Sequence, residues 1–446
     1  MHGLRTTKPI LRTLGIKDRK MDDRKIETGE ANSSRRRIWL RVSLTGLVLL
    51  LIWGIPEAVV RWRNPPLEDF RTIAFGGDPH SFDLFMQDWR LHWKLRPRVT
   101  TDFLGVPVRT DAHGFRGGEP GTGNRVVLCL GDSTTFGWKV EEADSYPNQL
   151  QARLNAAANS GKPWSVLNAG VPGYTSMQLR LLSEKLIHRW KPEVVIVCVG
   201  NNEAWPVARS DEQLDDDRAV ARCLGPVLSK SRFFVWVAEK FRSKEPQPFI
   251  APTLEDAVPR VSREEFGQNL LAIVQAARAA GARVILASPP VNLYWPPARF
   301  QLFPGWQEWE SFLKRMVDLR NSGQNQKVFE EIDSQLSQHP DAFAALWVKG
   351  AVLSDLGRED EGRELLEQAI EHHPFPENCK RSYRQVISET ARAEKTGFLD
   401  VNELFRRNAG ASTPKTLYLD WCHPTPQGHA LMAEALYRMM KEGGRE

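Results

Sequence analysis

Cysteine is scarce in this chain of 446 residues, with five in total and no Cys-x-x-Cys pair. That pattern excludes a typical structural zinc site and gives no disulfide framework, so we expect neither a metal nor another cofactor. Cys129 and Cys198 lie within apolar runs, where a free thiol usually acts as a small hydrophobic group. For Cys223, Cys379 and Cys422 the spacing alone leaves a disulfide bond open.

Most of the chain also lacks an excess of charge. Residues 1–37 hold eleven Lys and Arg against five Asp and Glu, a net of +6, while the whole chain carries only +5. The remaining residues are therefore almost neutral, which excludes a broad nucleic-acid-binding surface. The function of the basic segment is instead to be sought in the stretch that directly follows it, from Ile38 onward.

The next stretch has almost no charge at all. Between Ile38 and Pro56 only Arg41 is charged, and 19 residues of helix span roughly 28 Å, about one hydrocarbon core. A cleaved signal peptide normally has a short basic lead and a small-residue cleavage site, and both are missing here. A buried core helix is the other reading. We expect a transmembrane signal anchor over 38–60, with residues 1–37 in the cytoplasm by the positive-inside bias and the rest outside.

From Arg125 onward, short apolar segments alternate with helical patterns. Near-continuous Val, Ile and Leu runs suit strands that are buried on both faces of a parallel sheet. One intervening helix is expected to begin at a capping box formed by Ser262 and Glu265 and to end at Gly281. The sequence therefore predicts an α/β fold with helices on both sides of the sheet. The five expected strands are 125–130, 164–170, 193–200, 282–288 and 397–401.

Two further regions interrupt this regular pattern. Residues 61–124 are rich in Trp, Pro and Gly with weak periodicity, and we expect an extended linker that packs on the main domain. The main domain itself is expected in two parts, 125–306 and 377–446. The helical period of residues 307–376 separates these two parts.

The helical stretch has the spacing of a tetratricopeptide repeat. Pro340 and Pro374 are 34 residues apart, which is the length of that repeat. The upstream copy is degenerate. The stretch is either a small unit that docks a protein partner or a helical hairpin that merely enlarges the domain. The residues at the repeat's offsets are Leu346, Gly350, Leu353, Gly362, Leu366 and Ala369.

Polar residues and glycines gather where the expected strands end. In a parallel sheet, ligands bind beyond the carboxyl ends of the strands, so these residues are expected to converge. Each motif alone is weak, but the set in this order is hard to reach by chance. The set comprises Asp132 and Ser133 after the first strand, Gly170 at the end of the second, Gly200 and Asn202 after the third, and Asp420 and His423 after the fifth.

The members of this set also make chemical sense together. A serine hydroxyl is a poor nucleophile unless a neighbouring base takes its proton, and His423 can do so near neutral pH. Asp420, three residues earlier, can accept the other ring N–H, which fixes the tautomer and stabilises the imidazolium. Ser133, His423 and Asp420 are therefore the predicted catalytic residues.

Attack on an ester carbonyl creates an oxyanion, which needs donors placed in advance. We expect the backbone N–H groups of Ser133 and Gly170 and the side-chain amide of Asn202 to supply them. The loss of one such donor typically raises the barrier by roughly 3 kcal/mol. Asp132 and Gly200 are expected in supporting roles, and Asp132 in particular as the residue that orders the turn or caps the helix.

These motifs resemble those of the SGNH family, also called GDSL-type esterases and lipases. "GDSTTFG" resembles its first block, and Gly170, Asn202 and the Asp420–His423 pair resemble later blocks. The flanking "DAHGFRGGEP" and "NAGVPGYTS" look like a bacterial branch of the family. The resemblance implies a flavodoxin-like three-layer α/β/α fold and ester hydrolysis through an acyl-enzyme. One departure is Glu203, where the third block usually ends in Asp.

Aromatic residues also lie near the strand ends. They are expected either to stack on sugar faces or line an acyl pocket, or simply to cover the core. The residues are Trp138, Trp205, Tyr294, Trp295 and Trp421.

The sequence as a whole thus predicts a single-pass esterase on the outer face of a bacterial inner membrane, with cell-envelope glycan or lipid esters as substrates. Two alternatives stay open. An O-acyltransferase would use the same site, and a scaffold without activity would dock a partner through 307–376.

Overall fold

The computed structural model describes residues 37–63, 81–88, 90–157, 161–217, 224–225, 227–228, 230–240, 257–297, 306–409 and 416–442. These residues fall into two compact units. The smaller unit holds residues 37–63 and the described part of 228–241, and the larger unit holds the rest. The expected cytoplasmic tail before Arg37 and the thiol of Cys223 lie outside the described residues.

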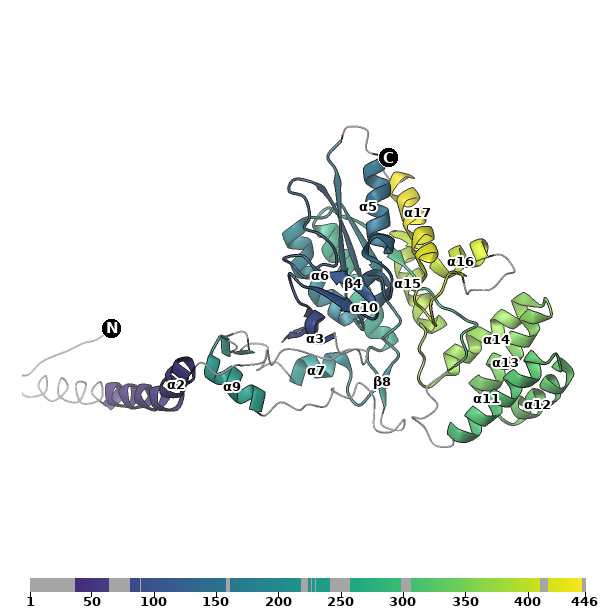
Figure 1. Cartoon of the computed structure of the whole chain (residues 1–446), viewed down its shortest axis with the longest axis horizontal. Coiled ribbons are helices and arrows are strands. Elements are labelled where there is room, and N and C mark those ends of the chain that lie inside the picture. Colours follow the sequence, from purple (N-terminus) through teal and green to yellow (C-terminus); the bar gives the residue numbers. More distant parts are fainter. Residues whose placement is uncertain are drawn as a thin grey trace, which may run out of the picture. The chain divides into compact units, whose positions relative to one another are not determined.

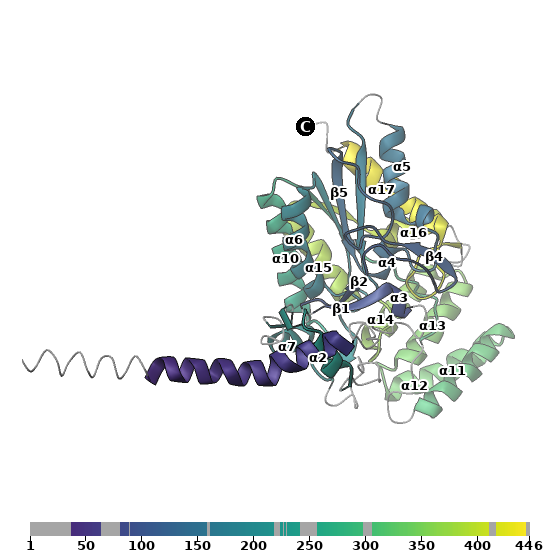
Figure 2. The ribbon, with the colours of Figure 1, turned by 60° about the vertical axis from the view of Figure 1, so that its left-hand side comes forward.

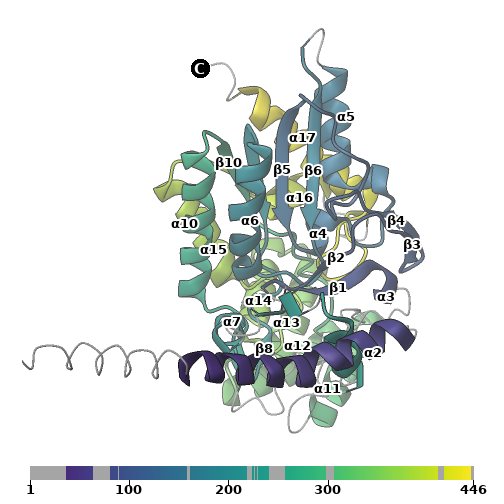
Figure 3. The same cartoon turned by 90° about the vertical axis from the view of Figure 1, so that its left-hand side faces the viewer.

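A five-stranded parallel sheet forms the centre of the larger unit. Taken in chain order, its strands lie in the order 2-1-3-4-5, which is the flavodoxin-like arrangement. Gly131 pairs with both Gly170 and Cys198, so the first three strands in chain order end level with one another. The five predicted strands are confirmed, and Figure 3 shows β5, β6 and β10 among them. They are β5 (Arg125–Gly131), β6 (Trp164–Gly170), β7 (Val194–Cys198), β10 (Arg283–Ala287) and β11 (Gly397–Leu399).

Helices cover both faces of this sheet (Figure 1). Each face has its own apolar core. Helix α10 begins at the predicted capping box, in which Ser262 accepts from the Glu265 N–H. One layer contains α6 (Ser176–Trp190), α10 (Arg263–Ala279) and α15 (Arg381–Ala393). The other contains α5 (Tyr146–Ala156), α16 (Val401–Ala409) and α17 (Pro426–Glu442).

The region expected as an extended linker is partly folded. Two antiparallel hairpins form there, and Phe85, Trp93 and Phe103 are buried in the same core as the sheet. Strands of only four residues carry too few alternations to give a periodic signal. The elements are α3 (Ser81–Leu84), β1 (Phe85–Asp88), β2 (His92–Leu95), β3 (Thr100–Phe103) and β4 (Val106–Arg109).

Four helices fill most of residues 307–376 and lie beside one another (Figure 2). They share a third apolar core. A Cβ on Gly350 would lie 2.6 Å from the Gly362 carbonyl oxygen, so two of these helices touch backbone to backbone. We call residues 306–372 the helical segment. It consists of α11 (Trp306–Asn321), α12 (Asn325–Gln338), α13 (Phe343–Asp355) and α14 (Glu359–His372).

The smaller unit is built on one long helix. Residues Arg37–Arg63 are long and apolar enough to cross a membrane, with a mean hydropathy of 2.0 in the most apolar window and no residue of that window buried. This helix contains a π-helical turn, η1 (Leu50–Gly54), and ends with α2 (Ile55–Arg63).

A second helix, α9 (Arg232–Lys240), packs on α2. The Glu57 carboxylate accepts hydrogen bonds from the Ser231 hydroxyl at 2.6 Å and from the Phe233 N–H at 2.8 Å, which caps α9. The ring centroids of Trp53 and Phe233 are 5.6 Å apart.

Candidate active site

Ser133 lies at a sharp turn between a strand and a helix. Strand β5 ends at Gly131, and the four-residue helix α4 (Ser133–Phe136) begins two residues later. Asp132 caps α4, because its side chain accepts the Thr134 N–H at 2.9 Å. The Ser133 N–H has no hydrogen-bond acceptor among the described residues. The turn therefore presents a hydroxyl and an unused N–H at the edge of the sheet.

The three residues predicted to be catalytic lie in contact. His423 Nε2 is 2.8 Å from Ser133 Oγ, and His423 Nδ1 is 2.8 Å from Asp420 Oδ2. All three residues are buried, with at most 8% of their surface exposed. Burial alone would raise the pKa of Asp420, but hydrogen bonds from the His423 ring and from the backbone hold this pKa below its ordinary value. Asp420 is thus a carboxylate that can orient the imidazole.

Asn202 is held in place by the loop after β6. Its side-chain Nδ2 donates to the Tyr174 carbonyl at 2.9 Å, which uses one of the two amide hydrogens and leaves the other for a ligand. Its neighbour Asn201 is fixed as well, because Oδ1 of Asn201 accepts the Cys379 N–H at 3.1 Å. Gly200 immediately precedes this pair and lies against the Cys379 sulfur.

The structure gives Gly170 a different part from the expected one. Its N–H donates to Asn168 Oδ1 at 3.1 Å, so this donor is already used. A Cβ at Gly170 would lie 2.2 Å from the Phe136 nitrogen, so the glycine lets β6 pack against α4. Gly173, three residues on, has an N–H with no acceptor among the described residues. It directly precedes Tyr174, whose carbonyl holds Asn202.

A buried ion pair that sequence reasoning missed supports this loop. Arg260 and Asp211 are 2.9 Å apart, and both side chains are at most 2% exposed. Arg260 also donates to the Gly173 carbonyl at 2.7 Å, and Asp211 accepts from the Thr175 hydroxyl at 2.6 Å. Asp211 opens α7 (Asp211–Asp217), and Arg260 follows β9 (Val258–Pro259), which pairs with β8 (Pro206–Val207). No local sequence signal joins residues this far apart.

A second buried arginine, Arg116, supports the helix that carries Ser133. Its guanidinium donates to the carbonyls of Phe136 at 2.8 Å and Val140 at 2.6 Å, and also to that of Gly137. Burial lowers the pKa of Arg116 to about 10, which still leaves it protonated at neutral pH. A cation at the carboxyl end of a helix is favourable, and this one fixes the turn after α4, before the short helix η2 (Glu142–Asp144). In the sequence, Arg116 could have been noticed only as the arginine of the "GFRG" motif, residues 114–117.

Two buried carboxyl groups lie behind the site. Burial raises the pKa of Asp132 to about 6 and the pKa of Glu203 to about 8. Glu203 accepts the Ser176 N–H at 2.7 Å and the Asn202 N–H at 3.2 Å. The Glu203 carboxyl, at the position where the SGNH motifs that the sequence resembles usually have Asp, therefore joins the amino end of α6 to the Asn202 backbone.

Aromatic rings surround the imidazole. Trp138 stacks on His423 with ring centroids 5.2 Å apart, and Trp421 approaches His423 edge-on at 6.0 Å. Trp295 contacts Trp421 at 6.1 Å. The Trp205 backbone carbonyl accepts the backbone N–H of Arg260.

The site does not suit a metal ion. Asp420, Cys422 and His423 place an oxygen, a sulfur and a nitrogen within 4.8 Å of one another. Both ring nitrogens of His423 are already used, however, and burial raises the pKa of the Cys422 thiol well above its ordinary value. A buried protonated thiol is a poor ligand. Cys129, Cys198, Cys379 and Cys422 are all free thiols.

Comparison with known proteins adds independent information. Residues 129–321 match the model of the GDSL-like lipase/acylhydrolase family. No match was found among curated proteins.

Similar solved structures include TesA, an acetylxylan esterase from Geobacillus stearothermophilus and the hydrolase LAE5 from the metagenome of Lake Arreo in Spain. Their sequence identities are 15%, 15% and 16%, with TM-scores of 0.35, 0.36 and 0.36. Each covers 71% of this chain, and this chain covers 99%, 94% and 94% of theirs. Similarity at this level says nothing about the substrate.

The family model matches a segment that begins at Cys129 within β5, contains Ser133 and Asn202, and ends before Asp420 and His423. Over these residues the chain is similar to GDSL-like lipases and acylhydrolases, and this similarity supports an enzyme that hydrolyses ester bonds.

Proposed function

We propose that this hydrolase is a membrane-anchored serine esterase with Ser133 as nucleophile, His423 as general base and acid, and Asp420 as the residue that orients the imidazole. The single observation that carries the proposal is the 2.8 Å contact between His423 Nε2 and Ser133 Oγ. The buried carboxylate at Nδ1 supports it, because it favours the tautomer whose Nε2 can accept a proton.

The first half of the reaction forms an acyl-enzyme. Ser133 Oγ attacks the ester carbonyl while its proton passes to His423 Nε2, and the positive charge on the ring is stabilised by Asp420. The negative oxygen of the tetrahedral intermediate accepts from the N–H groups of Ser133 and Gly173 and from the Asn202 amide. Gly173 takes the part first expected of Gly170, whose N–H is engaged by Asn168. The intermediate then releases the alcohol, which takes the proton back from His423.

The second half decides between hydrolysis and transfer. Water attacks the acyl group in an esterase, with His423 again as the base, and a free carboxylic acid leaves. A sugar hydroxyl in place of water would transfer the acyl group to a glycan, and the same side chains would serve. We propose hydrolysis as the main reaction and transfer as the alternative.

The location is part of the proposal. The helix Arg37–Arg63 would anchor the chain in the inner membrane of a bacterium, with the basic tail in the cytoplasm and the catalytic unit outside. The contact of α9 with α2 supports this, because α9 carries Phe233, Phe234 and Trp236 beside Lys230 and Arg232. Such a mixture suits the interface between lipid headgroups and acyl chains. An anchored enzyme would act on esters of envelope glycans or lipids.

The helical segment is proposed to be a tetratricopeptide-like insert in the catalytic domain. The backbone contact between α13 and α14 at Gly350 and Gly362 supports it, since small residues at these offsets let repeat helices pack closely.

A comparison of hydrolysis rates tests the enzymatic proposal. Full-length protein in detergent should cleave p-nitrophenyl acetate, and Ser133→Ala should lose this activity by a factor of about 10³ or more. Ser388→Ala is the control, since that hydroxyl donates to the Gln385 carbonyl on α15, and it should keep the parent rate. A Ser133→Ala protein as active as the parent would rule the mechanism out.

A further inference from the structure

A tryptophan ring lies almost flat on the imidazole of His423. The ring centroids of Trp138 and His423 are 5.2 Å apart, and the two ring planes are only 19° from parallel. The polar partners of the imidazole are at its two nitrogens, Asp420 at Nδ1 and Ser133 at Nε2. The reaction described above uses both of these polar contacts and gives no part to the indole on the face of the imidazole.

The backbone around Trp138 is fixed by the catalytic unit itself. The Trp138 N–H donates to the Ser133 carbonyl at 3.1 Å, which joins this residue to the proposed nucleophile. The chain before and after Trp138 is held by Arg116, whose guanidinium donates to the carbonyl of Gly137 and, at 2.6 Å, to that of Val140. The place of the indole therefore follows from the same contacts that fix the turn after α4.

The indole ring is also supported by the hairpin of β3 and β4. Phe103, the last residue of β3, is 1% exposed and meets the Trp138 ring edge-on, with centroids 5.4 Å apart and the planes at 85°. Phe103 contacts Phe136 of α4 in the same way, at 6.3 Å. Part of the region expected as a linker thus supports the ring that lies on His423.

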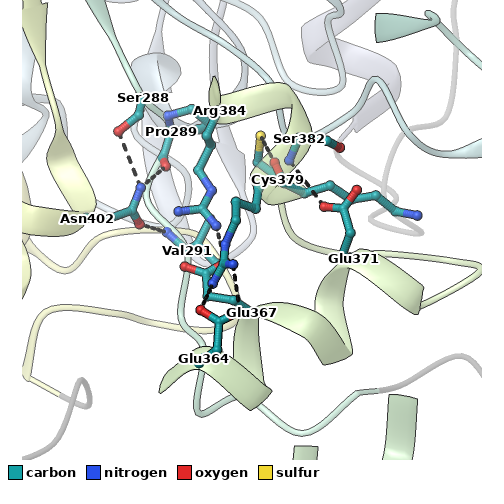
Figure 4. A network of polar contacts seen from close by, with 12 residues as sticks. Ser288, Pro289, Val291, Glu364, Glu367, Glu371, Cys379, Ser382, Arg384 and Asn402 are labelled. Atoms are coloured by element: carbon teal, nitrogen blue, oxygen red, sulfur yellow. Dashed lines mark hydrogen bonds and ion pairs between the residues drawn. The ribbon is translucent and has the colours of Figure 1, made fainter. Parts of the chain in front are cut away.

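The second partner of the stack, His423, is fixed through its own loop. Figure 4 shows Asn402 of α16 holding the loop after β10, where Asn402 Oδ1 accepts the Val291 N–H at 2.8 Å. The next residue of that loop, Asn292, donates with its side chain to the Asp420 carbonyl at 3.0 Å. Both rings of the stack are therefore held in place by contacts within the protein.

The stack gains strength when the imidazole becomes charged. In the proposed reaction Ser133 Oγ bonds to the ester carbonyl carbon while its proton moves to His423 Nε2, so the ring becomes a cation. The face of an indole is the negative part of its quadrupole and attracts a cation within about 6 Å of the ring centroid, more strongly than a phenyl face does. Because the neutral imidazole gains less from this attraction than the imidazolium, the contact lowers the reaction barrier.

We propose that Trp138 is a positioning residue of the reaction, which holds its π face against His423 and stabilises the imidazolium as it forms. The inference rests on the proposed esterase function and adds a residue to it. Phe103 and Arg116 act one step further away, as the supports of Trp138.

Graded fluorination of the indole separates this electrostatic role from packing. Tryptophan with one, two or three fluorine atoms is incorporated at position 138 alone of the full-length protein by codon suppression, and the protein is assayed in detergent. Each fluorine withdraws electron density from the ring face and changes the size of the ring little. We expect kcat for p-nitrophenyl acetate to fall stepwise, by about fivefold or more at three fluorines, with KM within twofold of the parent. Trp138→Phe should retain more of kcat than Trp138→Leu, because a phenyl face still attracts the imidazolium.

Trp164 is the matched control. The Arg125 guanidinium lies 3.8 Å from its ring centroid, so this ring also takes part in a cation–π contact, but Trp164 begins β6 and the site lies beyond the other end of that strand, at Gly170. The same fluorinated residues at position 164 should leave kcat at the parent value. An unchanged kcat in every variant fluorinated at position 138 would overturn the inference, and so would an equal loss at both positions. Failure of the parent to cleave p-nitrophenyl acetate would instead count against the esterase proposal itself.

Discussion

Replacement of Arg116 by Met should weaken both the fold and the activity, because this side chain holds the turn after α4 from within the core. Its guanidinium binds three carbonyls, those of Phe136, Gly137 and Val140. Phe136 keeps a second donor, the Asn168 amide at 3.2 Å, and Gly137 keeps a long contact of 3.4 Å from the Val140 N–H. The Val140 carbonyl is left without a donor among the described residues.

These contacts set the size of the effect. One orphaned buried carbonyl costs about 1–3 kcal/mol, and two weakened ones cost about 1 kcal/mol each. Removal of a buried cation returns part of this energy, so Arg116→Met should lower the free energy of unfolding by about 3 kcal/mol. The displacement of α4 should also lower kcat for p-nitrophenyl acetate by about tenfold or more, since Ser133 begins that helix.

The assay is a urea titration of the full chain in detergent, followed by tryptophan fluorescence and by residual activity. Arg109→Met is the control, because Arg109 is mostly exposed and pairs with Glu142, an interaction worth at most about 1 kcal/mol. Arg116→Met should unfold at a clearly lower urea concentration than the parent, and Arg109→Met close to it. If both variants unfold together with the parent, the reasoning about buried carbonyls is refuted.

Three further predictions follow from the same structure. Asn202→Ala should lower kcat for p-nitrophenyl acetate by about 10²–10³ with little change in KM, since one oxyanion donor is lost; an unchanged kcat would remove Asn202 from the site. Burial raises the Glu203 pKa to about 8, so between about pH 4.5 and 8 the folded state holds a proton that the unfolded state releases, and stability should fall as pH rises. Between pH 5 and pH 8 the urea midpoint of Glu203→Gln should therefore fall less than that of the parent, because glutamine cannot ionise. An equal fall in both proteins would contradict the raised pKa. Glu57→Ala removes the cap of α9, so protease should cut near α9 faster than in the parent, while Glu330→Ala, on the exposed face of α12, should leave cleavage unchanged.

The sheet could be predicted because its strands are long apolar runs that need no partner to be recognised. The contact between Ser133 and His423 could be expected for a related reason, since strand ends meet at one edge of a parallel sheet. The catalytic roles of these two residues are proposals. Their separation in the sequence does not give the distance between their side chains.

What the sequence could not supply depends on contacts between distant segments. Arg260 and Asp211 are 49 residues apart and meet only in the fold. Arg116 binds backbone carbonyls, which every residue has, so no complementary side chain marks its position. The choice between Gly170 and Gly173 rests on where β6 ends and which N–H groups the strand already uses.

The most direct test of the account is the rate at which a fluorophosphonate labels the full-length protein, with the labelled residue mapped by peptide mass spectrometry. We expect a single labelled residue, Ser133, and a rate at least 10²-fold lower in His423→Gln, because the hydroxyl then lacks the base that takes its proton. Labelling of His423→Gln as fast as the parent, or labelling at another residue, would contradict the claim that His423 activates Ser133.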